Sequence, residues 1–273
     1  MSSHLSVHLT QAKHSFDIFT LSESSESVQA SIASAWRLNN ETINIHSHLV
    51  GGAVFTLLPI YFHLAFDPPL ADAVVVSIFL EGVAICFLLS ALFHTLENHS
   101  PKVSDFMNHL DHLGIVILVW GAGISMIYYS FLCDVRLRIV YWTLMSCASA
   151  SCAAMTFISA FRTPKYHAWK IAAFVSLGLT GIIFIIHGIA AFGLETQKRR
   201  MPLLLVVAMM AANLVGVLVY AMRVPERWFP HKFNLLGCSH QIFHIAVVLA
   251  ACVHFATLIK ASTSARNETC VVV

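Results

Sequence analysis

The chain has 273 residues, of which 58% are hydrophobic and only 11% are charged, and its mean hydropathy is +0.75. Soluble domains carry about 25% charged residues, so this composition excludes an ordinary soluble protein. The formal charge is only +2, and the basic residues lie in the connections between apolar segments. That distribution excludes a nucleic-acid-binding surface.

Seven apolar segments predict seven membrane-spanning helices. A hydropathy window of about 19 residues finds them, and each can cross about 30 Å of hydrocarbon. They cover residues 44–66, 72–96, 109–131, 138–161, 169–193, 202–222 and 236–259. The connections are short, and several carry proline at their turns. We therefore expect an all-α membrane protein, a seven-transmembrane helix bundle in one domain of residues 38–262, with a C-terminal tail of residues 263–273.

The N-terminal tail, residues 1–37, lacks the apolar core of a signal peptide, so the first span is expected to act as the insertion signal. Apolar residues at near-helical spacing predict a short interfacial helix within residues 27–38. Of the 16 Lys and Arg residues, nine lie in the tail and the even-numbered connections and seven lie on the other side. This bias favours a cytosolic N-terminus and an extracellular or lumenal C-terminus, in the plasma membrane or an endomembrane.

Cysteine usage does not predict a disulfide framework. The chain has seven cysteines, and most of them lie inside apolar segments, where cysteine behaves as a small apolar residue. Cys133 and Cys270 lie on the same membrane side in a seven-span arrangement, so a bond between them is compatible with the topology.

Two histidines, His240 and His244, stand one helical turn apart at the start of the last span. Imidazoles at this spacing share a helix face and can bind one metal ion. Coordinating groups within a membrane-length segment are costly and are usually kept for function. The same pair can also arise by chance in a chain with 16 histidines.

Chain direction brings other polar groups to the same end of the bundle. His94 and Ser90 lie at the end of the second span, and Asp111 lies near the start of the third. Three imidazoles and a water form the open tetrahedral arrangement of catalytic Zn²⁺. We expect His94, His240 and His244 to bind the zinc ion, Asp111 to act as general base, and Ser90 to orient a ligand or support an oxyanion.

Other candidates have simpler explanations. Glu81 is excluded as a ligand because it lies about 20 Å from His94 along the helix. Cys238 lies off the face of the histidine pair and is interpreted as packing. His48 and His112 are candidates for contacts behind the ligands, whereas structural roles are expected for a last group of histidines, His63, His187 and His254.

The motifs that carry these residues resemble the progestin and adipoQ receptor family, which is related to haemolysin III. The similarity covers residues 37–259, through Asn40-Glu41-Thr42, Asn44-Ile45-His46-Ser47-His48, Ser90-Ala91-Leu92-Phe93-His94, Asp111-His112 and Ser239-His240-Gln241-Ile242-Phe243-His244. The segment Pro225-Glu226-Arg227-Trp228-Phe229-Pro230 is closest to the fungal and adiponectin-receptor-like branch.

The resemblance implies a seven-helix bundle with a cytosolic N-terminus and an intramembrane zinc site near the cytosolic side. It places the zinc on His94, His240 and His244 and connects Asp111 to the metal through water. His46 departs from the adiponectin receptors, which carry tryptophan there, and adds a candidate ligand or proton carrier. The long acidic cytosolic region of the animal receptors has no counterpart, so partner binding through it is not carried over.

Two functions from different classes follow. One is a zinc-dependent, ceramidase-like amide hydrolase that acts on a membrane lipid such as ceramide, as the family and its ceramidase relatives suggest. The other is a receptor or a regulator of membrane or zinc homeostasis whose zinc is structural. Three protein ligands favour an open, catalytic site. A pore is the least favoured function, because the fourth to sixth spans offer few polar groups.

Overall fold

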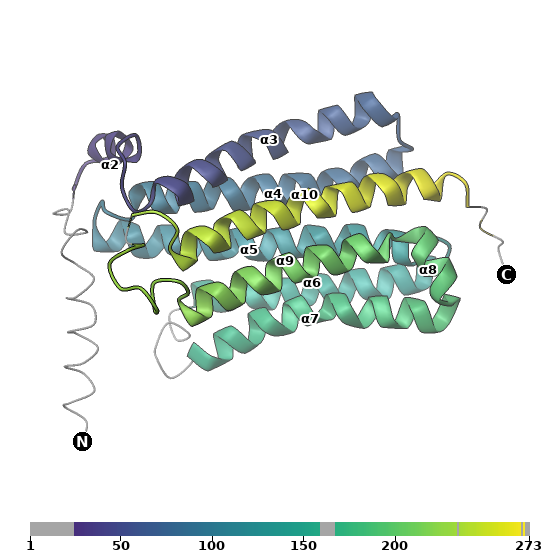
Figure 1. Ribbon diagram of the computed structural model, residues 1–273. Helices are drawn as coiled ribbons and strands as arrows, with labels where there is room; N and C mark the ends of the chain where they lie inside the picture. The colour runs from purple at the N-terminus through teal and green to yellow at the C-terminus, as the bar shows by residue number, and fades with distance from the viewer. Residues whose placement is uncertain (1–24, 159–166, 234, 269, 271–273) are drawn as a thin grey trace, which may run out of the picture.

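The computed structural model describes residues 25–158, 167–233, 235–268 and 270. Seven of its helices are long and apolar enough to cross a membrane, which confirms the predicted all-α, seven-span architecture. These helices are α3 (Thr42–Phe66), α4 (Leu70–Leu96), α5 (Pro101–Ser130), α6 (Val135–Phe157), α7 (His167–Phe192), α9 (Leu203–Met222) and α10 (Ser239–Ala265). They run side by side in one elongated bundle (Figure 1).

Two short helices lie at opposite ends of the bundle. Helix α2 (Val28–Ala35) precedes α3, and the Ser27 hydroxyl caps it by accepting a hydrogen bond from Ala30 N–H. This confirms the short helix predicted before the first span. Helix α8 (Leu194–Arg200), which the hydropathy pattern did not predict, lies at the other end (Figure 1).

Several helix ends differ from the predicted boundaries. Helix α5 begins at Pro101, well before the predicted start at residue 109, because proline fits the first turn of a helix. Helix α10 begins at Ser239 rather than at residue 236, since Gly237 has a φ of 83°. Helix α6 ends at Phe157, and the remainder of the predicted fourth span, residues 159–161, lies outside the described residues.

Helix α4 lies at the centre of the bundle and is the most buried of the spans. It packs against α3 on one side and α5 on the other. Glycine allows the close approach of α4 and α5, because a Cβ on Gly121 would lie 2.9 Å from the Ile78 carbonyl oxygen. A Cβ on Gly114 would likewise lie 2.9 Å from Cys86 Cα. Small residues serve this role in membrane bundles generally.

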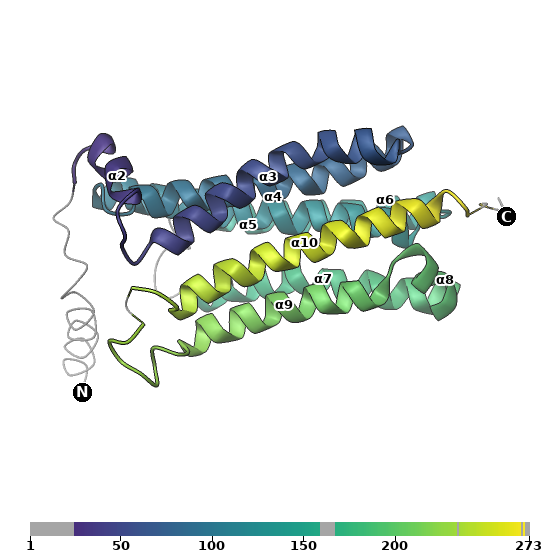
Figure 2. The ribbon, with the colours of Figure 1, turned by 45° about the horizontal axis from the view of Figure 1, so that its top comes forward.

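Helix α10 passes between α3 and α9 and contacts both, as the rotated view shows (Figure 2). It also contacts α4 and α5. The start of α10, the start of α3 and the end of α4 therefore lie at the same end of the bundle, close to α2 (Figure 1). We call this the α2 end, and the opposite end the α8 end.

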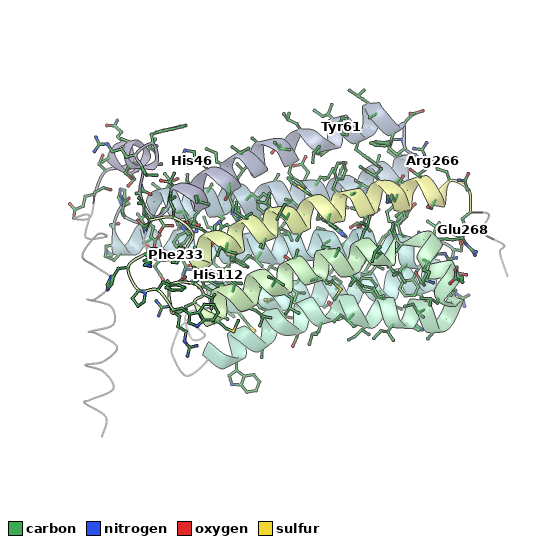
Figure 3. The ribbon with its side chains drawn as sticks, in the orientation of Figure 1. His46, Tyr61, His112, Phe233, Arg266 and Glu268 are labelled. Carbon is green, nitrogen blue, oxygen red and sulfur yellow. A yellow bond between two sulfur atoms is a disulfide. The ribbon has the colours of Figure 1, made fainter. Side chains whose placement is uncertain are left out.

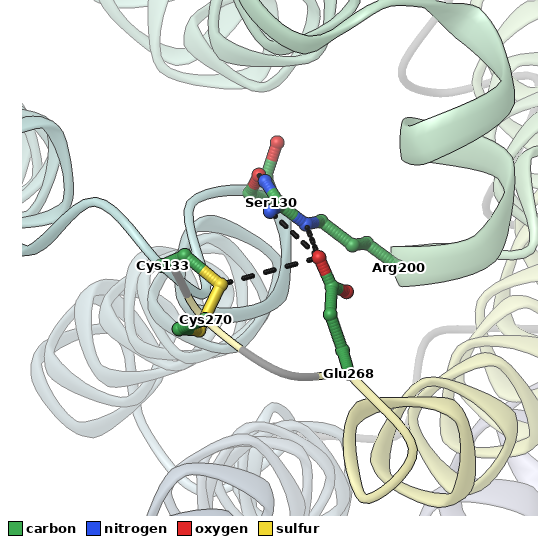
Figure 4. The surroundings of a disulfide bond; sticks show 5 residues. All are labelled: Ser130, Cys133, Arg200, Glu268 and Cys270. Carbon is green, nitrogen blue, oxygen red and sulfur yellow. Dashed lines mark hydrogen bonds and ion pairs between the residues drawn. A yellow bond between two sulfur atoms is a disulfide. The ribbon is translucent and has the colours of Figure 1, made fainter. Parts of the chain in front are cut away.

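A disulfide between Cys133 and Cys270 closes the α8 end (Figure 4). It joins the connection after α5 to the C-terminal tail, as the predicted topology allowed. Beside it, the Arg200 guanidinium pairs with Glu268 at 2.7 Å and donates a hydrogen bond to the Ser130 carbonyl oxygen. The tail is thus held to the bundle by one covalent bond and one ion pair.

Candidate metal centre

Three histidines from two helices meet inside the bundle at its α2 end. His94 lies in the last turn of α4, and His240 and His244 lie in the first two turns of α10. One ring nitrogen of each lies within 4.8 Å of the others. His94 and His244 are buried, whereas His240 is partly exposed. The tertiary structure therefore brings together the three residues that the sequence predicted.

The spacing of the three nitrogens fits a tetrahedral metal site. His240 Nε2 lies 3.3 Å from His94 Nε2 and 3.2 Å from His244 Nε2. Two nitrogens that each lie about 2.0–2.1 Å from one metal ion in tetrahedral geometry are about 3.3 Å apart. The cluster is thus able to hold a metal ion, and it offers one imidazole nitrogen from each histidine as a donor.

Glu41 orients the first of these ligands. The Glu41 carboxylate, one residue before α3, lies 2.8 Å from His94 Nδ1. We assign the ring proton of His94 to Nδ1 on this contact, which leaves Nε2 free to coordinate. Asn44 Nδ2 donates a second hydrogen bond to the carboxylate at 2.6 Å. Burial raises the pKa of Glu41, but its contacts with His94 and Asn44 outweigh that effect and leave the pKa below its ordinary value.

The loop before α10 fixes the other two ligands. The Glu226 carboxylate accepts hydrogen bonds from the backbone N–H and the hydroxyl of Ser239, the first residue of α10. A carboxylate at a helix N-terminus also offsets the positive end of the helix dipole. Gln241 accepts from Gly237 N–H at 2.6 Å and donates to the carbonyl oxygen of Asn40. These bonds tie the start of α10 to the segment that carries Glu41.

Asp111 and Ser90 form a second polar pair beside the histidines. Ser90 is buried on α4, one turn before His94, and its side chain lies beside Asp111 on α5. The Asp111 carboxylate also interacts electrostatically with His94. Asp111 and Ser90 thus lie beside the cluster, as expected from the direction of the helices.

The remaining candidates fall around this group. His48, buried on α3, stacks on His244 with ring centroids 4.0 Å apart and on Phe87 at 4.5 Å. His46 faces the outside of the bundle, where it packs edge-on against Trp36 at 5.5 Å, and it is not part of the three-histidine cluster. His112 shares the α2 end with His46 (Figure 3), and its Nδ1 pairs with the Asn108 carbonyl oxygen in its own helix.

Cys238 precedes the first residue of α10 and is half-buried. Burial raises the pKa of its thiol, which disfavours the thiolate form that metal ions bind. This agrees with the interpretation of Cys238 as packing.

A cavity of about 530 Å³ lies beside His240 at the α2 end. Its wall includes Glu41 and His240, together with Tyr220 and Arg223 from the end of α9. The cluster is therefore reachable by water and small polar molecules from this end, although two of its three histidines are buried.

Glu41 and Glu226 were not singled out from the sequence as site residues. Both lie in connections rather than in apolar segments, so neither is conspicuous as a charge within a span. The signal that pointed to them was indirect, since both belong to motifs of the family resemblance.

Comparison with known proteins identifies the family of this chain. The family model for haemolysin-III-related proteins matches residues 36–255. The chain is 34% identical over 231 residues to the adiponectin receptor protein of Drosophila melanogaster, a match that covers 84% of this chain and 52% of that protein. It is 32% identical over 235 residues to the ADIPOR-like receptor IZH1 of Eremothecium gossypii, covering 84% and 74% respectively.

A second fungal relative, the ADIPOR-like receptor IZH2 of Saccharomyces cerevisiae, is 30% identical over 231 residues, covering 83% of this chain and 73% of that protein. The chain thus spans about half the length of the insect relative and about three quarters of the fungal relatives. The residues that the family model matches, 36–255, include all seven spans except the last turns of α10.

Proposed function

Since this chain belongs to the haemolysin-III-related family and carries three converging histidines, we propose that it is a zinc-dependent hydrolase that cleaves the amide bond of a membrane lipid such as ceramide. The observation that supports this most is the spacing of the histidine Nε2 atoms, beside the partly buried Asp111. Water adds across the amide bond, and the products are a fatty acid and a long-chain amine.

The donor set favours zinc. Zn²⁺ binds neutral imidazole nitrogen in tetrahedral geometry, and three protein ligands leave one position open. A zinc ion bound here would polarise the amide carbonyl and lower the pKa of water. Glu41 holds His94 in the orientation that this requires, because its carboxylate fixes the opposite ring nitrogen.

Asp111 supplies the proton chemistry in this proposal. Its carboxylate accepts a proton from the attacking water and returns it to the departing amine nitrogen, as a general base and then a general acid. Ser90, which lies beside the Asp111 carboxylate, orients it in this proposal. The cavity beside His240 admits water from the α2 end, and the surrounding apolar bundle accommodates the acyl chain.

We further propose that the α2 end, with the N-terminus, faces the cytosol. Disulfides persist in oxidising compartments, and the Cys133–Cys270 bond lies at the α8 end. The bias in Lys and Arg favours the same orientation. The metal centre then lies near the cytosolic side, in the plasma membrane or an endomembrane.

A receptor is the second candidate function, and the names of the relatives favour it. The fruit-fly relative and both fungal relatives are named as receptors. In that case the metal ion is structural, and the protein is a receptor or a regulator of membrane or zinc homeostasis that responds to a lipid without hydrolysing it.

The test measures metal content and fatty-acid release from ceramide on the same detergent-purified samples. Wild-type protein is expected to hold one zinc ion per chain and to turn over. His94→Ala and His240→Ala are expected to lose both, whereas His63→Ala, which removes an exposed histidine far from the cluster, keeps both. Asp111→Asn is expected to keep the zinc and lower turnover about 100-fold or more.

The outcomes separate the two candidates. Zinc without turnover in the wild-type protein contradicts the hydrolase and favours the receptor. If Asp111→Asn still hydrolyses ceramide at the wild-type rate, Asp111 is not the general base. Wild-type protein without bound metal contradicts both the zinc-dependent hydrolase and the receptor with a structural metal ion.

A further inference from the structure

Glu81 is a carboxylate on the lipid-facing surface of α4. It lies about 16 Å along the helix from Leu70, so it is deep within a membrane-length segment. Its side chain is exposed, and among the described residues it makes no ion pair or hydrogen bond. Ionisable groups at such depths are costly, rare and usually functional. The metal centre does not use Glu81, because His94 is about 20 Å away along α4.

Glu81 lines a groove between α3, α4 and α5 with a volume of about 600 Å³. Most of the wall is apolar, including Pro59, Ile78, Ile85 and Ile117. The groove therefore combines a long hydrocarbon surface with one carboxylate, which is the pattern of a site for a molecule with an alkyl chain and one polar group.

The polar residues of the groove form a path toward the α8 end. Ser77 lies one helical turn from Glu81 on the same face of α4. His63, in the last turn of α3, also lines the groove. Both lie nearer than Glu81 to the α8 end, where α3 ends and α4 begins. The groove therefore offers polar side chains between Glu81 and the α8 end.

The chemistry of the wall favours a cation. A carboxylate in an apolar setting is stabilised by an opposite charge. Trp120 also lines the groove, and its indole N–H is already donated to Ser146 at 3.0 Å. What Trp120 offers a ligand is its ring, whose face attracts ammonium groups. A carboxylate together with an indole ring suits a protonated amine better than an alcohol or a fatty acid.

We propose that this groove binds a long-chain aliphatic amine, with its ammonium group at Glu81 and its alkyl chain along the apolar wall of α3, α4 and α5. The site is separate from the metal centre and does not depend on turnover there. If the proposed hydrolase is correct, its amine product belongs to this class of ligand.

The test uses octadecylamine that carries a photoactivatable diazirine on its chain, added to the full-length protein in detergent micelles. We expect the label to be attached within α3, α4 or α5. Unlabelled octadecylamine is expected to displace the labelled amine, whereas octadecanol and octadecanoic acid of the same chain length are not. Glu81→Gln preserves size and is expected to weaken binding about tenfold. Glu195→Gln, which removes an acidic charge from α8 at the α8 end, is the matched control and is expected to bind normally.

Two further variants separate the test of amine binding from the test of the proposed hydrolase. His94→Ala and His240→Ala are expected to retain amine binding even where they lose metal, so a failed hydrolase leaves this test valid. Equal displacement by octadecanol, or unchanged binding by folded Glu81→Gln, would overturn the amine site. Glu81-dependent cross-linking of two chains without amine binding would assign the groove to a second copy instead.

Discussion

At the scale of single residues, Glu41 shows how the metal centre is organised beyond its ligands. It lies one residue before α3, yet it contacts a histidine at the end of α4 and is held there by Asn44. Carboxylates that hold the second nitrogen of a ligating histidine fix the ring and raise its basicity. We therefore expect the strength of metal binding to depend on a residue outside both helices that carry the three histidines.

Substitution of Glu41 by glutamine tests this dependence. The variant keeps the size of the side chain but removes its negative charge, so we expect metal affinity to fall about 10- to 100-fold while the protein stays folded. Metal retained during titration with a chelator measures the effect. Glu195→Gln, at an exposed carboxylate paired with Lys198, is the control. Equal retention by the two variants would mean that Glu41 does not support His94.

The sequence did not decide whether His48 contacts the histidine cluster. It was a candidate for a contact behind the ligands, and the structure stacks it between Phe87 and the ligand His244. Its neighbour His46, two residues earlier, points away and meets Trp36. Helical periodicity places these two side chains on different faces, but only the neighbouring helices decide which face meets the metal centre.

At the scale of helices, the contact between α4 and α5 determines how far His94 lies from Asp111. His94 and Ser90 lie on α4 and Asp111 on α5, so the separation of these two helices sets the distance between the histidine cluster and the aspartate. Glycines at the contact allow the backbones to approach closely. The stability of the bundle and the geometry of the centre therefore share the same interface.

Gly121→Ala tests this interface. The added methyl group would lie 2.9 Å from the Ile78 carbonyl oxygen and 3.2 Å from Phe79 Cα, so we expect the free energy of unfolding to fall by about 1–3 kcal/mol. Gly181→Ala on α7 meets no atom within 4 Å and, as the matched control, is expected to be neutral or slightly stabilising because alanine favours helix. Thermal unfolding in detergent distinguishes the two, and equal melting temperatures would contradict the tight contact.

At the scale of the whole molecule, the two ends of the bundle carry different structural features. The α2 end carries the histidine cluster and its cavity. The α8 end carries the disulfide and the Arg200–Glu268 ion pair, which hold the C-terminal tail (Figure 4). Figure 3 shows this separation, with His46, His112 and Phe233 at one end and Arg266 and Glu268 at the other.

Removal of the disulfide tests whether the ends are independent. The double variant Cys133→Ser/Cys270→Ser opens a covalent loop with a sequence separation of 137 residues. We expect a loss of about 2–4 kcal/mol in unfolding free energy, seen as a lower melting temperature, with metal content unchanged. The control replaces the exposed free cysteines Cys147 and Cys252 by serine. Loss of metal only in the disulfide variant would show that the ends are coupled.

The sequence by itself determined that this is a membrane protein, that it has seven spanning helices, and that these helices alternate in direction. Apolar segments must span a bilayer as helices, because hydrocarbon offers no partner to free backbone groups. Alternating direction then placed His94, Asp111, His240 and His244 at one end of the bundle. These are consequences of local composition and chain order, so no tertiary contact was needed to reach them.

Only the tertiary structure decided which side chains touch. It brought His240 Nε2 within 3.3 Å of His94 Nε2 and 3.2 Å of His244 Nε2, set Glu41 behind His94, and turned His46 away from the cluster. It also placed Glu81 in a groove formed by three helices. Such contacts depend on the rotation and separation of whole helices, which are fixed by packing between segments far apart in the chain. A hydropathy pattern carries no information about either quantity.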